Sequence, residues 1–140
     1  MSTIYNDIRA SFDVALNSVV GIPVIEWENL SSEGRTLGDE YISQFWLGGN
    51  TEAGSLGDTG LDQINGVYQI NVNVKSGTGT ARINELCDLI ADQFRPRKKL
   101  TYNSVSVRIK SLSRNATTVD GAYATAVIDI EYETFTTQRT

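Results

Sequence analysis

The clearest pattern of apolar and polar positions runs from Gly66 to Phe94. Between Gly66 and Lys75 the two kinds of residue alternate, which is the period of a strand with one buried face. After residues 76–80 the apolar residues recur at helical spacing, which predicts an amphipathic helix. A strand and a helix joined this closely are expected to pack together, with Tyr68, Ile70, Val72 and Val74 against Ile83, Leu86, Cys87 and Ile90.

The same two periods predict the remaining elements. A first helix follows a cap at Ser2 or Thr3 and ends at Gly21 and Pro23. Proline cannot donate a hydrogen bond to a neighbouring strand, so the strand after Pro23 is expected at a sheet edge. The first helix covers residues 4–19, and strands are predicted over residues 24–29, 41–47, 105–110 and 122–132 in addition to 66–75. We therefore expect one α+β domain over residues 1–140, with a mixed, mainly antiparallel sheet of about five strands flanked by two helices.

Two stretches lack a regular pattern. Residues 48–65 are rich in glycine and predict a long flexible loop, which in a compact domain is either a working loop or an unstructured one. We expect a long hairpin whose outer part becomes ordered against a partner. Residues 134–140 are polar and predict a frayed tail.

The last two predicted strands carry charges of opposite sign. If they pair with their apolar faces together, Arg108 and Lys110 fall directly or diagonally opposite Asp129 and Glu131. Cross-strand pairs of this kind stabilise a sheet by about 0.2 to 1 kcal/mol each. This pairing explains the acidic residues Asp129, Glu131 and Glu133 of the last strand more simply than a metal site does.

Composition limits the possible functions. The chain has 140 residues with 12 basic and 17 acidic side chains, so its net charge of −5 gives no general footprint for nucleic acid. It has no histidine, which removes the commonest general base and metal ligand. Its single cysteine, Cys87, lies on the apolar face of the second helix and is expected to be a buried thiol. Without a leader or a membrane-spanning run, we expect synthesis and residence in the cytosol unless the protein is packaged.

No motif for catalysis or cofactor binding is present. Asp58 and Asp62, or Asp129, Glu131 and Glu133, are the only candidates for acid–base or calcium sites, and neither group has a specific spacing. The Gly77-Thr78-Gly79 turn lacks both the third glycine of a dinucleotide fingerprint and the Gly-Lys-Ser/Thr of a phosphate loop. A helix cap at Thr78 or Thr80 explains this turn. We predict that the protein is not an enzyme.

Two surface features suggest interactions. The first is a basic run of Arg95, Arg97, Lys98 and Lys99, which is either a solvated helix end or a contact for DNA or an acidic partner. The second is Asn71 and Asn73 on the polar face of a good strand, where asparagine is disfavoured. An uncharged polar face is common where a sheet meets another subunit, so it hints at self-assembly.

The order of elements, with particular residues in it, resembles the tail terminator or tail completion proteins of long-tailed bacteriophages. The resemblance spans nearly the whole chain and has no catalytic signature. Its stretches are Ile4-Tyr5-Asn6-Asp7-Ile8-Arg9, Ile22-Pro23 to Trp27-Glu28-Asn29, Leu56-Gly57-Asp58-Thr59-Gly60-Leu61-Asp62 leading into Gly66-Val67-Tyr68-Gln69-Ile70-Asn71-Val72, and Val105-Ser106-Val107-Arg108-Ile109.

The resemblance implies a mixed sheet flanked by helices and a hexameric ring at the head-proximal end of the virion tail, assembled in the host cytoplasm. The ring would cap the tail tube, end the polymerisation of tube protein and present the surface for head joining. Its partners would be the tube protein, head-to-tail connector proteins and genome DNA passing without sequence readout, with no membrane, cofactor or reaction. Alternatives are a connector subunit of the same particle or a small ligand-binding or regulatory domain.

Within that hypothesis the residues themselves indicate two candidate surfaces. Gln69, Asn71, Asn73, Leu56, Asp58 and Leu61 are candidates for the subunit or tube interface. Arg95, Arg97, Lys98 and Lys99 are candidates for a basic patch at the lumen or at a docking face.

Overall fold

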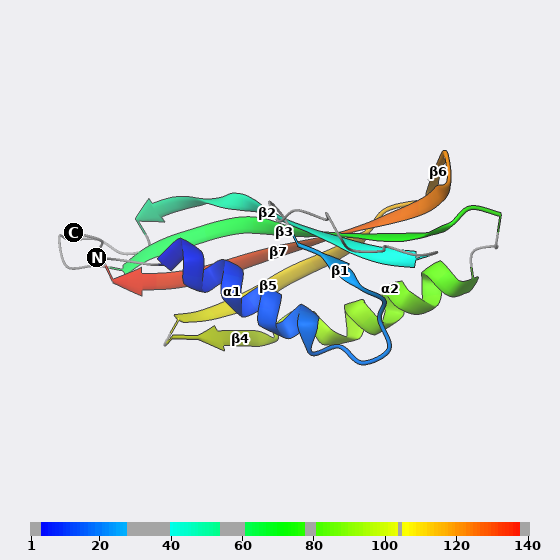
Figure 1. Ribbon diagram of the computed structural model, residues 1–140. Coiled ribbons are helices and arrows are strands. Elements are labelled where there is room, and N and C mark those ends of the chain that lie inside the picture. The colour runs from blue at the N-terminus through cyan, green and yellow to red at the C-terminus, as the bar shows by residue number, and fades with distance from the viewer. Residues whose placement is uncertain (1–3, 28–39, 54–60, 78–80, 104, 138–140) are drawn as a thin grey trace.

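One seven-stranded sheet organises the part of the chain that the computed structural model describes, namely residues 4–27, 40–53, 61–77, 81–103 and 105–137 (Figure 1). The strand order is β1-β2-β3-β7-β5-β4, with β6 pairing with β7 outside this path. Only β1 and β2 are parallel, and the other neighbours are antiparallel. The strands are β1 (Ile25–Glu26), β2 (Glu40–Ala53), β3 (Leu61–Lys75), β4 (Lys99–Tyr102), β5 (Val105–Arg114), β6 (Thr118–Asp120) and β7 (Tyr123–Thr137).

Both helices lie on the same face of this sheet. Helix α1 (Ile4–Asn17) packs over β4 and β5, and α2 (Ala81–Gln93) packs over β3 and β7 (Figure 1). The core between helices and sheet includes Phe12 of α1, Tyr68 of β3 and Tyr132 of β7, all fully buried. Phe12 stacks on Tyr68 with ring centroids 4.6 Å apart. The amphipathic helices therefore bury their apolar sides against the apolar side of the alternating strands.

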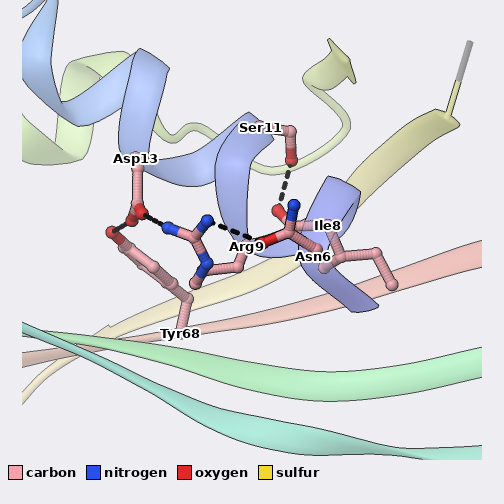
Figure 2. A network of polar contacts seen from close by, with 6 residues as sticks. All are labelled: Asn6, Ile8, Arg9, Ser11, Asp13 and Tyr68. Carbon is pink, nitrogen blue, oxygen red and sulfur yellow. Dashed lines mark hydrogen bonds and ion pairs between the residues drawn. The ribbon is translucent and has the colours of Figure 1, made fainter. Parts of the chain in front are cut away.

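A polar network ties α1 to the centre of the sheet (Figure 2). The Tyr68 hydroxyl donates a 2.5 Å hydrogen bond to Asp13 Oδ1, and Arg9 forms an ion pair with the same carboxylate. Arg9 also donates to Asn6 Oδ1 at 2.8 Å. Burial, together with the neighbouring Asp13 carboxylate, raises the pKa of Tyr68. This hydroxyl therefore stays protonated and remains a donor.

The fold class predicted from the periodicity is confirmed. The sheet is mixed and mainly antiparallel, with seven described strands where about five were expected. The predicted packing of the 66–75 strand against the second helix is also confirmed, because Tyr68, Ile70, Val72, Val74, Ile83, Leu86, Cys87 and Ile90 share one core. The strand after Pro23 lies at the sheet edge as predicted.

The predicted loop over residues 48–65 is wrong at both of its ends. Strand β2 continues to Ala53 and β3 begins at Leu61, with Asn50 opposite Asn65. A bulge lies between Trp46 and Gly49, where Gly48 has a φ of 83°. The expected long hairpin is therefore present, and Gly48 and Gly49 lie in its paired strands rather than in its loop, since a positive φ and close strand contact favour glycine.

Two further predictions near the end of the chain need correction. Arg108 pairs directly with Glu133, which leaves Glu131 only diagonally opposite it, and Lys110 lies at a bulge between Ile109 and Ser111 instead of opposite an acidic residue. The predicted frayed tail is strand as far as Thr137, since β7 pairs with β3 over its whole length. The short strand β4 was also missed, because the basic run hides its alternation.

Several predicted features lie outside the described residues. They are the first helix cap at Ser2 or Thr3, the second cap at Thr78 or Thr80, and the interface candidates Leu56 and Asp58.

Candidate assembly surfaces

The sheet has a helix-free face, opposite α1 and α2, and this face carries most of the polar positions of its strands. Because side chains alternate along a strand, the residues that pair with one another across β2, β3 and β7 share a face. Neutral and apolar side chains dominate the part of the helix-free face that β2 and β3 form, namely Tyr41, Ser43, Phe45, Val67, Gln69, Asn71 and Asn73. Strand β7 continues these rows with Thr125, Val127 and the acidic residues Asp129 and Glu131.

Three predicted interface residues, Gln69, Asn71 and Asn73, lie next to one another on this face, but their accessibility differs. Asn73 is only 6% exposed, and its Oδ1 accepts a 2.8 Å hydrogen bond from Thr125. Gln69 is half-buried and donates to Asp129 Oδ1 at 3.1 Å. The Oδ1 atom of Asn71 is shielded from solvent and accepts no hydrogen bond from any described residue. Asn73 therefore acts mainly inside the sheet, whereas Asn71 has an acceptor still to satisfy.

The acidic row of β7 is engaged in hydrogen bonds. Glu133, 6% exposed, forms an ion pair with Arg108 and accepts a hydrogen bond from Gln63 at 3.0 Å. Glu131 accepts from Ser111 at 3.2 Å. No group of three histidine, cysteine, aspartate or glutamate side chains that could hold a metal ion occurs in the described part of the chain.

The predicted basic patch lies beside β4, at one end of the strand order. Arg97 and Lys99 are exposed, and Arg95 is exposed with a weak ion pair to Asp92 at 4.0 Å. Lys98 is half-buried and donates to Gln93 Oε1 at 2.9 Å. The backbone of residues 97–98 is held by two hydrogen bonds to Ile109. The patch is thus fixed to β5 rather than being only a solvated helix end.

Charge is segregated between the two ends of the sheet. We call Glu26, Glu40 and Glu52, which lie on β1 and β2, the acidic edge; these two strands contain no lysine or arginine. We call Lys99, Arg108, Lys110 and Arg114, which lie on β4 and β5, the basic edge; these two strands contain no aspartate or glutamate. The sequence alone could not reveal this segregation, because it depends on the strand order.

The remaining candidates are less informative. Leu61 begins β3 and pairs through its backbone with Thr137. Cys87 is 4% exposed, and burial raises the pKa of its thiol. It borders a cleft of about 320 Å³ between α2 and β5, lined also by Leu112 and Arg114. No described helix is long and apolar enough to cross a membrane.

Comparisons with known proteins agree with this architecture. A family model described as phage tail terminator protein matches residues 7–132. A solved structure with 21% sequence identity covers 99% of this chain and 99% of its own, with a TM-score of 0.71, and so shares the fold. The search of curated proteins found no match. The chain therefore belongs to the phage tail terminator protein family and is a structural component of the virion tail.

Proposed function

We propose that the protein caps the tail tube as a homo-oligomeric ring, with six copies, at the head-proximal end of the tail. The ring ends the polymerisation of tube protein and presents the surface to which the DNA-filled head joins. Membership of the tail terminator family supports the tail role. The observation that carries assembly is the helix-free face, whose middle is uncharged and partly apolar on β2 and β3.

Specific residues on this face support contact with another subunit or with the tube. Phe45 and Val67 are half-buried without a covering helix, and Asn71 Oδ1 has no donor from the described residues. A neighbouring chain would cover the apolar atoms and supply that donor. Gln69 and Asn71 are therefore the proposed interface residues, whereas Asn73 bonds within the sheet to Thr125.

The proposed role of the basic patch is to border the lumen or the head-docking surface. DNA passes through the lumen without sequence readout, so cationic side chains near it need only general attraction to phosphate. Arg97 and Lys99 are exposed and suit this role. Charge reversal at Arg97, Lys98 and Lys99 is expected to reduce head joining and infectivity. Unchanged head joining and infectivity would contradict this part of the proposal.

The ring is tested by native mass spectrometry and electron microscopy. We expect rings of one stoichiometry, alone or seated on tube ends, and tubes of uncontrolled length when the protein is withheld. A chain that stays monomeric at every concentration, alone and with tubes, would refute the proposal. Rings that bind the head vertex but never tube ends would indicate a connector subunit instead.

A further inference from the structure

The two ends of the sheet differ in charge in a way that the fold itself does not require. The acidic edge carries three glutamates and the basic edge four lysines or arginines, with no opposite charge on the same strands. Some of these charges are engaged within the chain, as in the Glu40–Arg82 and Arg108–Glu133 ion pairs. Lys99 and Lys110 are exposed and form no ion pair with any described residue.

Part of the acidic edge and part of the basic edge also lie in the same row of paired residues across the sheet. A continuous row of paired residues crosses the sheet through Asn50, Asn65, Glu133, Arg108 and Lys99. Lys99 is thus level with Asn50, and Glu52 follows two residues later on β2. Residues 50, 52 and 99 share the helix-free face, because side chains two apart on a strand and those paired across strands point the same way.

In this row, both edge strands have an outer side that pairs with no described strand. Strand β1 pairs with β2 only at Ile42 and Ser43, and no described strand pairs with the outer side of β2 from Gln44 to Ala53. No described strand pairs with the outer side of β4. The four antiparallel pairings between β2 and β4 make these two strands run in the same direction, as their arrowheads show in Figure 1. Unpaired strand edges of this kind are sites for joining another chain.

We propose that the acidic edge of one copy docks beside the basic edge of the next, with Glu52 of the first copy close to Lys99 of the second. This inference rests on the proposed ring and assigns the sheet edges to the contact between neighbouring copies, which leaves the helix-free face for the contact with the tube. A head-to-tail contact of this kind keeps every copy in the same orientation and closes into a ring when the rotation fits. A two-fold contact between identical edges would instead oppose charges of the same sign.

The test uses two full-length variants in which the charges at positions 26, 52, 99 and 110 carry a single sign, while Glu40, Arg108 and Arg114 are left unchanged. Glu26→Lys with Glu52→Lys makes all four positions basic, and Lys99→Glu with Lys110→Glu makes all four acidic. A third variant combines all four substitutions and exchanges the signs at these positions. Asp88→Lys on the exposed side of α2 and Lys75→Glu at the end of the central strand β3 are matched reversals away from both edges.

The proposal predicts complementation between the two single-sign variants. Each one alone should assemble at least about tenfold more weakly than the natural chain, because like charges face each other across every contact. Mixed in equal amounts, with one variant labelled by heavy isotopes to separate their masses, they should form rings that hold equal numbers of the two variants, which native mass spectrometry measures. The four-substitution variant should assemble by itself, and the two control reversals should assemble as the natural chain does.

The outcomes separate this inference from the proposed function. If the natural chain forms rings and the single-sign variants form them equally well, the edge contact is wrong while the ring stands. The edge contact is also wrong if the variants fold by circular dichroism, fail to assemble alone and fail again when mixed. If the natural chain never assembles, with or without tubes, the ring itself is refuted. Weaker assembly of the natural chain at higher salt is a further expected result.

Discussion

Gly66 lies directly against the ring and hydroxyl of Tyr132, in the middle of the β3–β7 pairing. Gly66 and Tyr132 are register partners, and a methyl group at position 66 would overlap the Tyr132 hydroxyl and the Gly48 carbonyl oxygen. Tyr132 is fully buried, and its hydroxyl accepts a 2.8 Å hydrogen bond from Trp46 Nε1. It also donates to the Gly48 carbonyl at 3.3 Å. The bulge in β2 and the glycine in β3 together make room for one tyrosine.

Gly66→Ala is therefore expected to destabilise the protein. Overpacking of a close contact costs about 1–3 kcal/mol, and the Gly48 backbone has to shift because its carbonyl cannot rotate away. Urea unfolding measures this loss. Gly121→Ala is the control, since nothing lies within 4 Å of its added methyl group and only its φ of 65° opposes the change. A Gly66→Ala protein as stable as the natural chain would contradict the packing.

Tyr132→Phe is expected to lower the unfolding free energy less than Gly66→Ala does, because the aromatic ring stays in place. The substitution removes the acceptor of the Trp46 indole and the donor to Gly48, so we expect a loss of about 1 kcal/mol in unfolding free energy. Tryptophan fluorescence reports the change directly, with a shift of the emission as Trp46 loses its hydrogen bond. Unchanged emission and stability together would show that the two hydrogen bonds contribute nothing.

The Gly66–Tyr132 contact explains why part of the fold could not be predicted from the sequence. Gly48 and Gly49 are loop residues by composition, and only the partner strands reveal that Gly49 and Gly66 leave room for Tyr132. Regular alternation, by contrast, predicted the 66–75 strand and its packing against α2, because one buried face is enough to produce the pattern. Glycine has no side chain to contribute to a pattern, so bulged strands are easily missed.

The candidate assembly surfaces were predictable only in part. Gln69 and Asn71 are identifiable because polar amides are unusual on a strand, and the structure places both on the helix-free face. Glu52 was hidden within a predicted loop, and its relation to Lys99 depends on four strand pairings that connect residues far apart in the chain. Local patterns do not determine strand order, which arises from tertiary packing.

Tyr68→Phe tests the polar link between α1 and β3. The substitution removes the hydrogen bond that the Tyr68 hydroxyl donates to the charged Asp13 carboxylate. Because this bond is partly shielded from solvent, its loss should lower the unfolding free energy by about 2 kcal/mol. Tyr102→Phe is the matched control, because the Tyr102 hydroxyl forms no hydrogen bond with a described residue and its loss should change stability little. Equal effects of the two substitutions would mean that the Tyr68–Asp13 bond does not stabilise the fold.

The ion pair between Arg82 of α2 and Glu40 of β2 should make stability depend on pH. Hydrogen bonds from Arg82 at 2.9 and 2.6 Å hold the pKa of Glu40 below its usual 4.5, with burial opposing the shift. A lowered folded-state pKa gives stability that is present above the unfolded pKa and is lost as pH falls through the folded one.

Arg82→Met should therefore flatten the dependence of unfolding free energy on pH below about 4.5 and raise the pKa of Glu40, followed by NMR titration. Arg95→Met removes a more distant, exposed pair and serves as the control. A Glu40 pKa that stays low in the Arg82→Met protein would show that another group is responsible.

Cys87 should react slowly in the folded protein and quickly in the unfolded one. It is 4% exposed and joins the core between α2 and the sheet, and burial raises its pKa while Arg114 opposes the shift in part. Burial and the raised pKa keep the thiolate scarce and out of reach, so a disulfide reagent should label the native chain about a hundredfold or more slowly than the chain in urea. Fast native labelling at a rate that urea does not change would show that the thiol is accessible and that α2 does not cover it.

The same thiol should also contribute to the pH dependence of stability. Because the folded state holds the thiol proton more tightly, this contribution is complete below the pKa of the unfolded thiol and is lost as pH rises through the higher folded pKa. Urea unfolding at a series of alkaline pH values measures the loss. A Cys87→Ala protein should lack this component, since alanine has no proton to release. An identical alkaline decline in the Cys87→Ala protein would assign the decline to other groups, because the thiol would then bind its proton equally in both states.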